Sequence, residues 1–321
     1  MPRASLFLHI LLLSTACLAQ DYPTKPIVMV LPFPPGGVAE IVGRPLASMM
    51  EKSLKQPVIL INRPGAGGAV GMGSVAKGPS DGYTILMGLS SISIFPVSDR
   101  INGKTPAYEL KDFAPIALIT ADPTVLVVRT DGPYKTLKDF VDAAKANPGK
   151  INYSSSGVYG TLHVAMEIFA NAAGIKLFHV PYQGGGPAVT ALLGSQVDAS
   201  AQGPAAAIGQ IRAGKMRALA GWGNERLALL PEIPTLKELG YDAEFYIWTG
   251  VFVPAATPAP IQARLREAVR AAATSGDFKS AMEKVQTPVA YLDAPEFQKY
   301  WDRDAARLKA AVEKIGKVEE K

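Results

Sequence analysis

Short runs rich in β-branched residues alternate with longer amphipathic stretches along most of the chain. A brief, continuous apolar run is typical of a buried strand, whereas apolar positions three and four apart indicate a helix. This pattern predicts strands at 27–31, 58–61, 84–87, 116–119, 125–128, 151–153, 177–180, 197–201 and 217–220. It predicts helices at 38–53, 137–146, 161–173, 260–273 and 295–314.

Continuous apolar strands that alternate with helices indicate buried, mainly parallel sheets flanked by helices, so the predicted fold class is α/β. The run 248–254 resembles a strand that returns to the first sheet after a second set of strands and helices. We therefore expect two lobes with a discontinuous chain assignment. Lobe 1 comprises 20–121 plus 247–321, and lobe 2 comprises 122–246.

Residues 1–19 resemble a cleavable export signal, with Arg3 at the start, an apolar stretch and a small-residue cleavage site. That stretch of about ten residues is shorter than the roughly 20 that span a bilayer, and no later segment approaches this length. The prediction is a soluble, exported protein. Lipid attachment at Cys17 is the alternative, although Ser14 occupies a position where such sites usually carry an aliphatic residue.

Composition narrows the classes of function. The 321 residues are 48% hydrophobic and 19% charged, which is typical of a globular protein. The 33 basic and 28 acidic residues are interspersed and form no stripe, so we expect no nucleic-acid partner. Signal removal also takes away the only cysteine, Cys17, which excludes disulfides and thiolate chemistry from the mature chain.

Two glycine turns repeat one pattern in the two halves of the chain. Residues 31–39 and 180–188 both run from a strand end through proline and an aromatic residue to Gly-Gly and a helix start. Loops of this kind border the ligand crevice of an open α/β sheet, and their amides favour a carboxylate or phosphate. The alternative is that both are ordinary turns that use glycine for its backbone freedom.

Two further loops belong to this set, at 62–68 and 154–161. The second is rich in serine and opens a helix that carries His163. Hydroxyl groups around a helix start can donate to one carboxylate. Thr161 has the alternative role of a simple N-cap, and His163 that of a neutral, buried helix residue.

Signatures of enzymes are largely missing from the sequence. There is no Gly-x-Ser-x-Gly elbow and no Walker loop, and the mature chain keeps only His163 and His179. Gly71-x-Gly73-x-x-Ala76 matches a loosened dinucleotide fingerprint, but it lies well beyond its strand and no ribose-binding carboxylate follows. We predict no cofactor and no metal site, and a site built only from carboxylates stays open as an alternative.

A set of motifs resembles the Bug-type solute-binding proteins of tripartite tricarboxylate transporters. Each motif alone is weak, but their order over essentially the whole mature chain is specific. They are Tyr22-Pro23-x-Lys25-Pro26-Ile27, Pro32-Phe33-x-Pro35-Gly36-Gly37, Asn62-Arg63-Pro64-Gly65-Ala66-Gly67-Gly68, Asp81-Gly82-Tyr83-Thr84, Ser155-Ser156-Gly157, His163, His179-Val180-Pro181-Tyr182, Gly186-Pro187-Ala188, Ala213-Gly214-Lys215-x-Arg217-Ala218-Leu219-Ala220, Pro234-Thr235 and Pro254-Ala255-x-Thr257-Pro258.

The resemblance implies a two-lobed periplasmic binding protein, the Venus flytrap fold, that closes on a small carboxylate and delivers it to membrane permease subunits. Hinge motion would occur near 120–123 and 245–249, and we expect a monomer. The resemblance and the loops together predict ligand contacts from Phe33, Pro35, Gly36, Gly37, Val38, Ala39, Glu40, Gly67, Ser90, Ser155, Ser156, Gly157, Thr161, His163, Tyr182, Gly185, Gly186, Pro187 and Gln202.

Two positions depart from the family pattern. Glu40 stands where the first loop usually ends in aspartate, and Gln202 stands where many members have aspartate after a strand. A neutral amide at 202 can donate to a carboxylate, whereas aspartate would better suit an ammonium group. We therefore expect a dicarboxylate that lacks an amine. Walls for an aromatic acid are available from Tyr159, Tyr182, Trp222 and Phe95, for which core packing is the alternative.

Three classes of function follow from these observations. A carrier that serves a tripartite transporter comes first, and a module that presents its ligand to a membrane sensor kinase comes second. The third is an exported enzyme that acts on carboxylates. Only the partner separates the first two classes, whereas an enzyme would consume its ligand.

Overall fold

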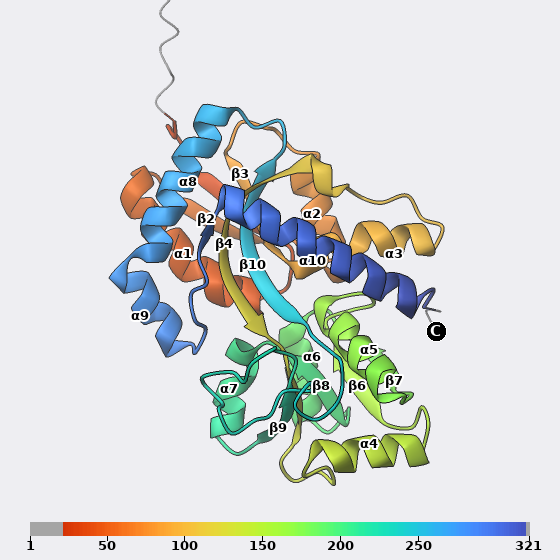
Figure 1. The fold of residues 1–321 in the computed structure, drawn as a ribbon. Helices are drawn as coiled ribbons and strands as arrows, with labels where there is room; N and C mark the ends of the chain where they lie inside the picture. The colour runs from red at the N-terminus through yellow and green to blue at the C-terminus, as the bar shows by residue number, and fades with distance from the viewer. Residues whose placement is uncertain (1–21, 319–321) are drawn as a thin grey trace, which may run out of the picture.

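The computed structural model describes residues 22–318, which fold into two α/β lobes stacked one above the other (Figure 1). The predicted signal peptide, including Cys17, lies outside the described residues. The described chain builds one six-stranded and one five-stranded sheet, and helices cover both. The two-lobed α/β fold predicted from the sequence is confirmed.

The first sheet has the order β11-β4-β10-β3-β1-β2. Its strands are β1 (Ile27–Leu31), β2 (Val58–Asn62), β3 (Thr84–Leu89), β4 (Phe113–Pro123), β10 (Tyr246–Pro254) and β11 (Leu292–Asp293). Strand β1 pairs in parallel with β2 and β3, whereas β10 lies antiparallel between β3 and β4. The predicted return of the chain to the first sheet is therefore confirmed.

The second sheet has the order β7-β6-β8-β5-β9. Its strands are β5 (Val125–Arg129), β6 (Asn152–Ser155), β7 (Phe178–Pro181), β8 (Ala199–Gln202) and β9 (Met216–Gly221). Strand β6 is parallel to β7 and β8, and β5 is antiparallel to both of its neighbours. Both sheets are thus mixed, which corrects the expectation of mainly parallel pairing. A strand buried on both faces is apolar whichever way its neighbours run, so the pattern does not reveal direction.

Ten α-helices cover the two sheets within residues 22–318. They are α1 (Val38–Leu54), α2 (Ala69–Ala76), α3 (Phe95–Ile101), α4 (Leu137–Ala146), α5 (Thr161–Ala173), α6 (Gly185–Leu193), α7 (Pro204–Arg212), α8 (Ala259–Thr274), α9 (Gly276–Lys284) and α10 (Ala294–Ile315). None of them combines the length and the apolar character that a bilayer crossing requires.

Strands β4 and β10 connect the lobes and run side by side from the first sheet toward the second (Figure 1). Their register places Ile247 opposite Asp122, and the hydroxyls of Thr120 and Thr249 lie 2.9 Å apart in the buried part of the ladder. This crossing contains the two segments where the sequence predicts a hinge.

Helix α10 also reaches from one lobe to the other. In the middle of the helix, the carboxylate of Asp304 accepts a hydrogen bond from Nε1 of Trp248, on strand β10, at 2.7 Å. Just after the C-terminal end of the helix, the carbonyl oxygen of Gly316 accepts a hydrogen bond from the hydroxyl of Tyr159 at 2.7 Å. The C-terminal helix therefore joins the first lobe to the loop that opens α5.

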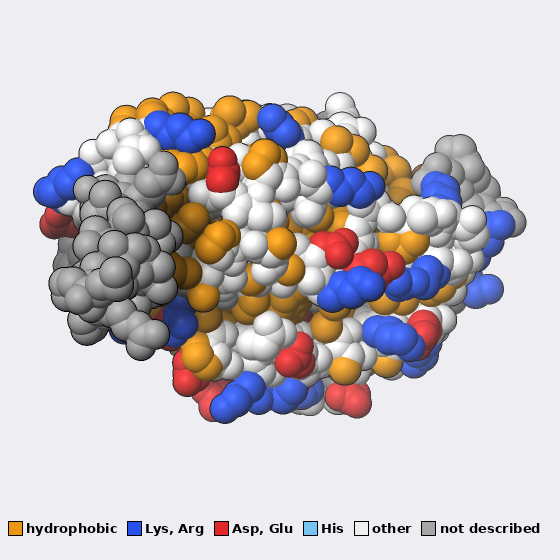
Figure 2. Space-filling model, turned by 90° about the horizontal axis from the view of Figure 1, so that it is seen from above, with side chains coloured by type: hydrophobic (Ala, Val, Ile, Leu, Met, Phe, Trp, Pro, Cys, Tyr) orange, Lys and Arg blue, Asp and Glu red, His pale blue; other side chains and the backbone are white. Residues whose placement is uncertain are grey.

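Figure 2 views the molecule from above, onto the first lobe. Lysine and arginine side chains are interspersed with aspartate and glutamate over this face, and no basic stripe runs across it. This distribution agrees with the mixed charge pattern of the sequence.

Candidate functional site

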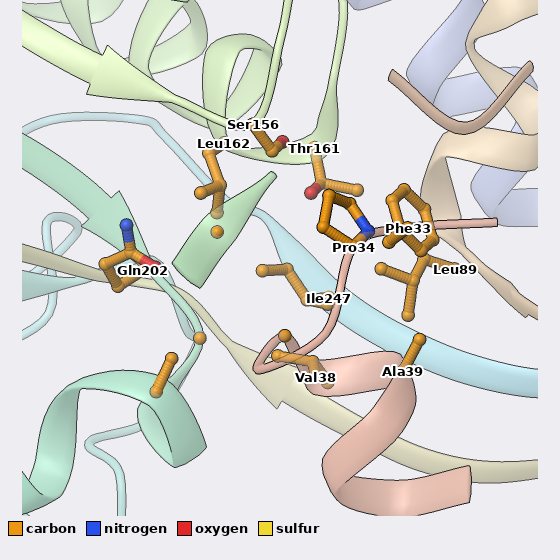
Figure 3. Close-up of a pocket in the computed structure, with 14 residues that line it drawn as sticks. Phe33, Pro34, Val38, Ala39, Leu89, Ser156, Thr161, Leu162, Gln202 and Ile247 are labelled. Atoms are coloured by element: carbon orange, nitrogen blue, oxygen red, sulfur yellow. The ribbon is translucent and has the colours of Figure 1, made fainter. Parts of the chain in front are cut away.

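A small cavity lies between the lobes, where strand ends meet the beginnings of several helices (Figure 3). It has a volume of about 30 Å³, which is room for roughly two water molecules. Ser156, Thr161 and Gln202 supply its polar side chains, and none of its lining residues is charged. The lining residues are Phe33, Pro34, Gly37, Val38, Ala39, Leu89, Ser156, Thr161, Leu162, Gly185, Gln202, Gly203, Ala206 and Ile247.

Four helices begin at this cavity, and the start of α1 is visible in Figure 3 beside Val38 and Ala39. Their N-caps are Gly37 for α1, Gly160 for α5, Gly184 for α6 and Gly203 for α7, and none has a side-chain cap. The first amides of a helix lack an acceptor inside it, and each N-terminus carries about half a positive charge. The cavity is thus bordered by four positive dipole ends and by first-turn amides without a side-chain cap, except at Pro187 of α6 and Pro204 of α7, which have no N–H. None of its lining residues supplies a cation.

Of the six helices that begin elsewhere in the described chain, α2, α3 and α8 also lack a side-chain cap, whereas the other three have one. The N-caps of α4, α9 and α10 are Thr136, Ser275 and Asp293, and each side chain accepts a backbone N–H of its own helix. These residue types are the usual N-caps. Glycine at the cavity therefore leaves open a position that the chain fills on α4, α9 and α10.

The first glycine turn is held from outside the cavity. Gly36 has a φ of +84°, and its N–H donates to Oε2 of Glu40 at 2.7 Å. Glu40 also accepts from Arg44, and these contacts, the Gly36 hydrogen bond first, lower the pKa of the Glu40 carboxyl. Glu40 and the Gly36 amide are thus engaged with the loop itself and do not line the cavity, contrary to expectation.

The second glycine turn packs directly on the first. A Cβ added at Gly184 would lie 3.0 Å from Cδ of Pro34, and one at Gly186 would lie 3.4 Å from the carbonyl oxygen of Pro35. Gly184 also has a φ of +130°. Close backbone approach and a left-handed conformation together explain glycine at 184. The two turns that echo each other in the sequence face each other across the lobes.

A second pair of glycines meets behind the cavity. Gly67 and Gly157 have φ values of +65° and +118°, and a Cβ on Gly157 would lie 3.5 Å from the Cα of Gly67. Neither residue lines the cavity. Their close approach fixes how near the loops at 62–68 and 154–161 come to each other.

The serine-rich loop presents two hydroxyl side chains to the cavity, Ser156 and Thr161 (Figure 3). Both side chains are buried. Thr161 is the first residue of α5 and Gly160 is the N-cap, so the alternative of Thr161 as a simple cap is wrong. Both hydroxyls therefore lie beside the uncapped amides of α5 and can donate with them.

His163 is buried behind the loop rather than exposed in the cavity. Its Nδ1 accepts the N–H of Tyr159 at 3.0 Å, and its ring stacks on His179 with centroids 4.1 Å apart. Burial, then the neighbouring His179, lowers the pKa of His163 well below its usual value. Nε2 of His179 lies 2.6 Å from Oγ of Ser155. His163, His179 and Ser155 thus shape the loop.

Gln202 lies at the opposite wall of the cavity. Its Nε2 donates to Oγ of Ser200 at 2.8 Å, and its carbonyl oxygen is turned toward the cavity (Figure 3). The sequence led us to expect that the Gln202 amide donates a hydrogen bond to a ligand carboxylate. In the structure, Gln202 instead presents an acceptor, its carbonyl oxygen, to the cavity. Ser200 in turn donates to the carbonyl oxygen of Ser154, which holds this orientation.

None of the four aromatic residues proposed as walls lines the cavity. Trp222 is fully buried and donates from Nε1 to the carbonyl oxygen of Ala165, while Phe95 packs near Gly67. The hydroxyl of Tyr182 donates to Gln196, and that of Tyr159 bonds to the end of α10. Trp222 and Phe95 therefore pack in the core, and Tyr159 and Tyr182 make hydrogen bonds outside the cavity.

The cavity brings together eight of the predicted contacts. These are Phe33, Gly37, Val38, Ala39, Ser156, Thr161, Gly185 and Gln202. The others do not line it and lie in the surrounding loops or core, namely Pro35, Gly36, Glu40, Gly67, Ser90, Ser155, Gly157, His163, Tyr182, Gly186 and Pro187. Among these residues, Ser90 directly follows Leu89, which lines the cavity. The buried Oγ of Ser90 has no hydrogen-bond partner among the described residues.

Several lining residues are missing from the sequence-based prediction, namely Pro34, Leu89, Leu162, Gly203, Ala206 and Ile247. Gly203-Pro204 carries a usable signal, because proline at the first helical position after a strand end is typical of a helix start. Ile247 carries none, because only the pairing of β10 with β4 brings it between the lobes.

Residues 42–317 match the family model of the tripartite tricarboxylate transporter family receptor, TctC. Among curated proteins, a UPF0065 protein of Bordetella pertussis is 36% identical over 270 residues, which is 84% of this chain and 83% of the relative. Protein BugT of the same organism is 36% identical over 241 residues, which is 74% of this chain and 73% of the relative. These levels of identity over most of each chain agree with the family match.

Solved structures give the same result for the fold. The periplasmic binding protein BugD aligns with a TM-score of 0.85 at 30% identity and covers 92% of this chain and all of its own. MatC from Rhodopseudomonas palustris with bound malate aligns with a TM-score of 0.83 at 28% identity over 91% of this chain and all of its own.

The matched family is a transporter receptor family and BugD is a periplasmic binding protein, which excludes the exported enzyme considered from the sequence. The motifs, the two-lobed fold and the uncharged cavity between facing glycine turns agree with that role. The chain belongs to the tripartite tricarboxylate transporter receptor family, whose members are periplasmic solute-binding proteins.

Proposed function

We propose that this protein captures a small dicarboxylate between its lobes in the periplasm and delivers it to the permease subunits of a tripartite transporter. The observation that carries the proposal is the meeting of four helix N-termini with glycine caps at one cavity. Their dipoles favour an anion, as do the first-turn amides other than at Pro187 and Pro204, which have no N–H. A site of dipoles and hydroxyls without a cation also suits a carrier that must release its cargo.

Capture requires the lobes to separate first. A cavity of about 30 Å³ has no room for a dicarboxylate, so the ligand enters an open form and the lobes then close around it. The crossing of β4 and β10 is the proposed hinge, with lobe boundaries near residues 121–122 and 246–247. On this proposal, residues 1–19 direct export and are removed, and the mature protein acts as a monomer.

A hydroxyl on the ligand is favoured by Gln202. Its carbonyl oxygen faces the cavity and accepts a hydrogen bond, but it lacks the negative charge that would select an ammonium group. MatC, a neighbour of the same fold, binds malate, which is a hydroxy dicarboxylate. We therefore propose a hydroxy dicarboxylate over an acidic amino acid.

The test replaces a glycine cap by a self-capping residue. Gly37 has a φ of −91°, and a Cβ added there would have only the Pro34 carbonyl oxygen nearby, at 4.0 Å. In Gly37→Asp, the new carboxylate would accept the α1 amides and repel an anion, whereas Gly37→Asn would fill them without charge. We expect the aspartate variant to lower dicarboxylate affinity roughly 100-fold or more.

Calorimetric titration of malate, succinate, aspartate and the neutral succinamide provides the measurement, with thermal unfolding as the control. Both variants are expected to be at least as stable as the wild type, because either residue is a favourable N-cap. The asparagine variant should bind more weakly than the wild type and more tightly than the aspartate variant. Wild-type affinity in the aspartate variant would remove α1 from the site, and tightest binding of aspartate would refute the ligand class.

A further inference from the structure

A second concave region lies in the second lobe, between the start of α4 and strand β9, at the end of the molecule remote from the first lobe (Figure 1). It has a volume of about 610 Å³ and shares no lining residue with the cavity between the lobes. We call it the β9 groove. It is lined by Thr130, Lys135, Thr136, Leu137, Lys138, Ile211, Gly214, Met216, Arg217, Ala218, Leu219, Ile233, Pro234 and Leu239.

Arg217 is the most unusual residue of this groove. Its side chain is half-buried, and its Nε is fully covered yet has no hydrogen-bond partner among the described residues. Oγ1 of Thr130, in the same groove, is also buried and without a partner. Buried polar atoms are nearly always paired, so these two atoms are available to a water or to a group that enters the groove.

The charged residues of the groove are all basic. Lys135 donates from Nζ to the carbonyl oxygens of Thr130 and Gly132 at 3.0 and 2.7 Å, and Lys138 pairs with Asp142. Arg217 alone of the three has no partner in residues 22–318. A guanidinium offers a planar fork that fits a carboxylate, so the missing partner is best matched by an acidic side chain.

Strand β9 is the edge of its sheet. Its last residue, Gly221, donates its N–H to the carbonyl oxygen of Pro234 at 2.9 Å and accepts from Leu236 at 2.8 Å. This short parallel bridge shows that the outer side of β9 can be paired. No such bridge continues to the residues of β9 before Gly221 in the described chain, and exposed edges of this kind accept an added strand.

Apolar side chains complete the groove. Leu239 is among the large hydrophobic residues that stay exposed, at 41%, and Ile211 and Ile233 are half-buried beside it. A segment with alternating apolar and acidic residues would place one face on these side chains and the other toward Arg217.

We propose that the β9 groove binds an extended, acidic segment of a partner protein, whose main chain pairs with β9 and whose carboxylate binds Arg217. The motif around Arg217, Ala213 to Ala220, takes no part in the cavity between the lobes, and this docking gives it a role. The partner docks while the ligand cavity stays free, which is the geometry a carrier needs to meet a membrane component.

The experiment uses the mature chain and a labelled seven-residue peptide that alternates valine and glutamate, with a glutamine version as the neutral control. Fluorescence anisotropy gives the affinity. We expect the glutamate peptide to bind roughly 10-fold to 100-fold more tightly than the glutamine peptide, as a hydrogen-bonded charge implies. Hydrogen exchange should show protection of the β9 amides on binding.

Two substitutions distinguish binding in the β9 groove from nonspecific attraction between the positive charge of the protein and the acidic peptide. Arg217→Gln is expected to remove the preference for the glutamate peptide, whereas Lys215→Gln, an exposed cation outside the groove, should change the affinity less than about twofold. Both variants should keep the wild-type affinity for dicarboxylates, which separates this proposal from the proposed function. The proposal is overturned by absence of peptide binding up to millimolar concentration, by equal binding of both peptides, by unchanged binding in Arg217→Gln, or by competition from free acetate at the peptide's own concentration.

Discussion

Asp122 offers a direct test of how burial acts at the crossing between the lobes. Its side chain is only 3% exposed on β4, and its Oδ1 has no hydrogen-bond partner in the described chain. Loss of hydration is the cause that raises the pKa of this carboxyl to about 7. The informative change is Asp122→Asn, which keeps the shape and removes the titration.

The size of the stability change follows from the difference between the pKa values of Asp122 in the folded and unfolded states. A carboxyl whose pKa is higher in the folded than in the unfolded state destabilises the fold once it ionises, so stability falls as pH rises between the two values. From a usual 3.8 to about 7 the loss amounts to about 4 kcal/mol, at about 1.4 kcal/mol per pKa unit. Relative to the wild type, Asp122→Asn should therefore gain about 4 kcal/mol of stability between pH 4 and pH 8.

Urea unfolding of both proteins at several pH values between 4 and 8 measures this difference. Any cost of burying the asparagine amide is constant with pH, so only the slope of the difference tests the reasoning. Asp242→Asn, which makes the same substitution at an exposed position, serves as the control for the substitution itself. A flat difference for Asp122→Asn would refute the argument that desolvation governs this residue.

Two further predictions concern the second lobe. Burial lowers the pKa of His179 to about 4, so its contribution to stability is present above pH 6.5 and declines by up to about 3 kcal/mol as pH falls to 4. In urea unfolding, His179→Gln should reduce the loss of stability at low pH without abolishing it, because the pKa of His163 is also lowered, and an unchanged pH profile would contradict this expectation. Ionisation of Asp122 lowers stability as pH rises over the same range, whereas protonation of His179 lowers stability as pH falls. The pH profile of the wild type alone therefore does not separate the two contributions. Gln202→Glu places a negative charge at the cavity and should weaken dicarboxylate binding about 100-fold by calorimetry, whereas unchanged affinity would place the ligand elsewhere.

Secondary structure was the part most readily predicted from the sequence. The strand Ile27–Leu31 and the helices Leu137–Ala146 and Thr161–Ala173 match their predicted bounds. A continuous apolar run marks the strand, and apolar positions three and four apart mark the helices. The direction of β5 and β10 was not predictable, because antiparallel pairing depends on distant partners. Helices α6 and α7 lack strong amphipathic periodicity, and α7 was missed altogether.

The candidate site could be predicted to the level of its loops. Phe33, Gly37 and Gly185 follow strand ends, which is where an α/β crevice forms, and the cavity includes them. Glu40 follows the same loop, yet the Gly36 amide and Arg44 draw its carboxylate away from the cavity. Sequence proximity to a loop does not determine which way a side chain turns, because nearby donors compete for it.

The distribution of helix caps connects the sequence to the proposed function more closely than any single motif. A cap of serine, threonine or aspartate stabilises a helix by filling its first amides, and α4, α9 and α10 use such residues. The same filling at the cavity would remove the donors that an anion needs. Glycine gives up only a few tenths of a kcal/mol relative to a capping residue while leaving those amides open. Because α2, α3 and α8 also lack a side-chain cap, ligand binding is supported by the gathering of four such helix starts at one cavity. Their shared position then predicts an anion whose affinity depends on amides and dipoles more than on any one side chain.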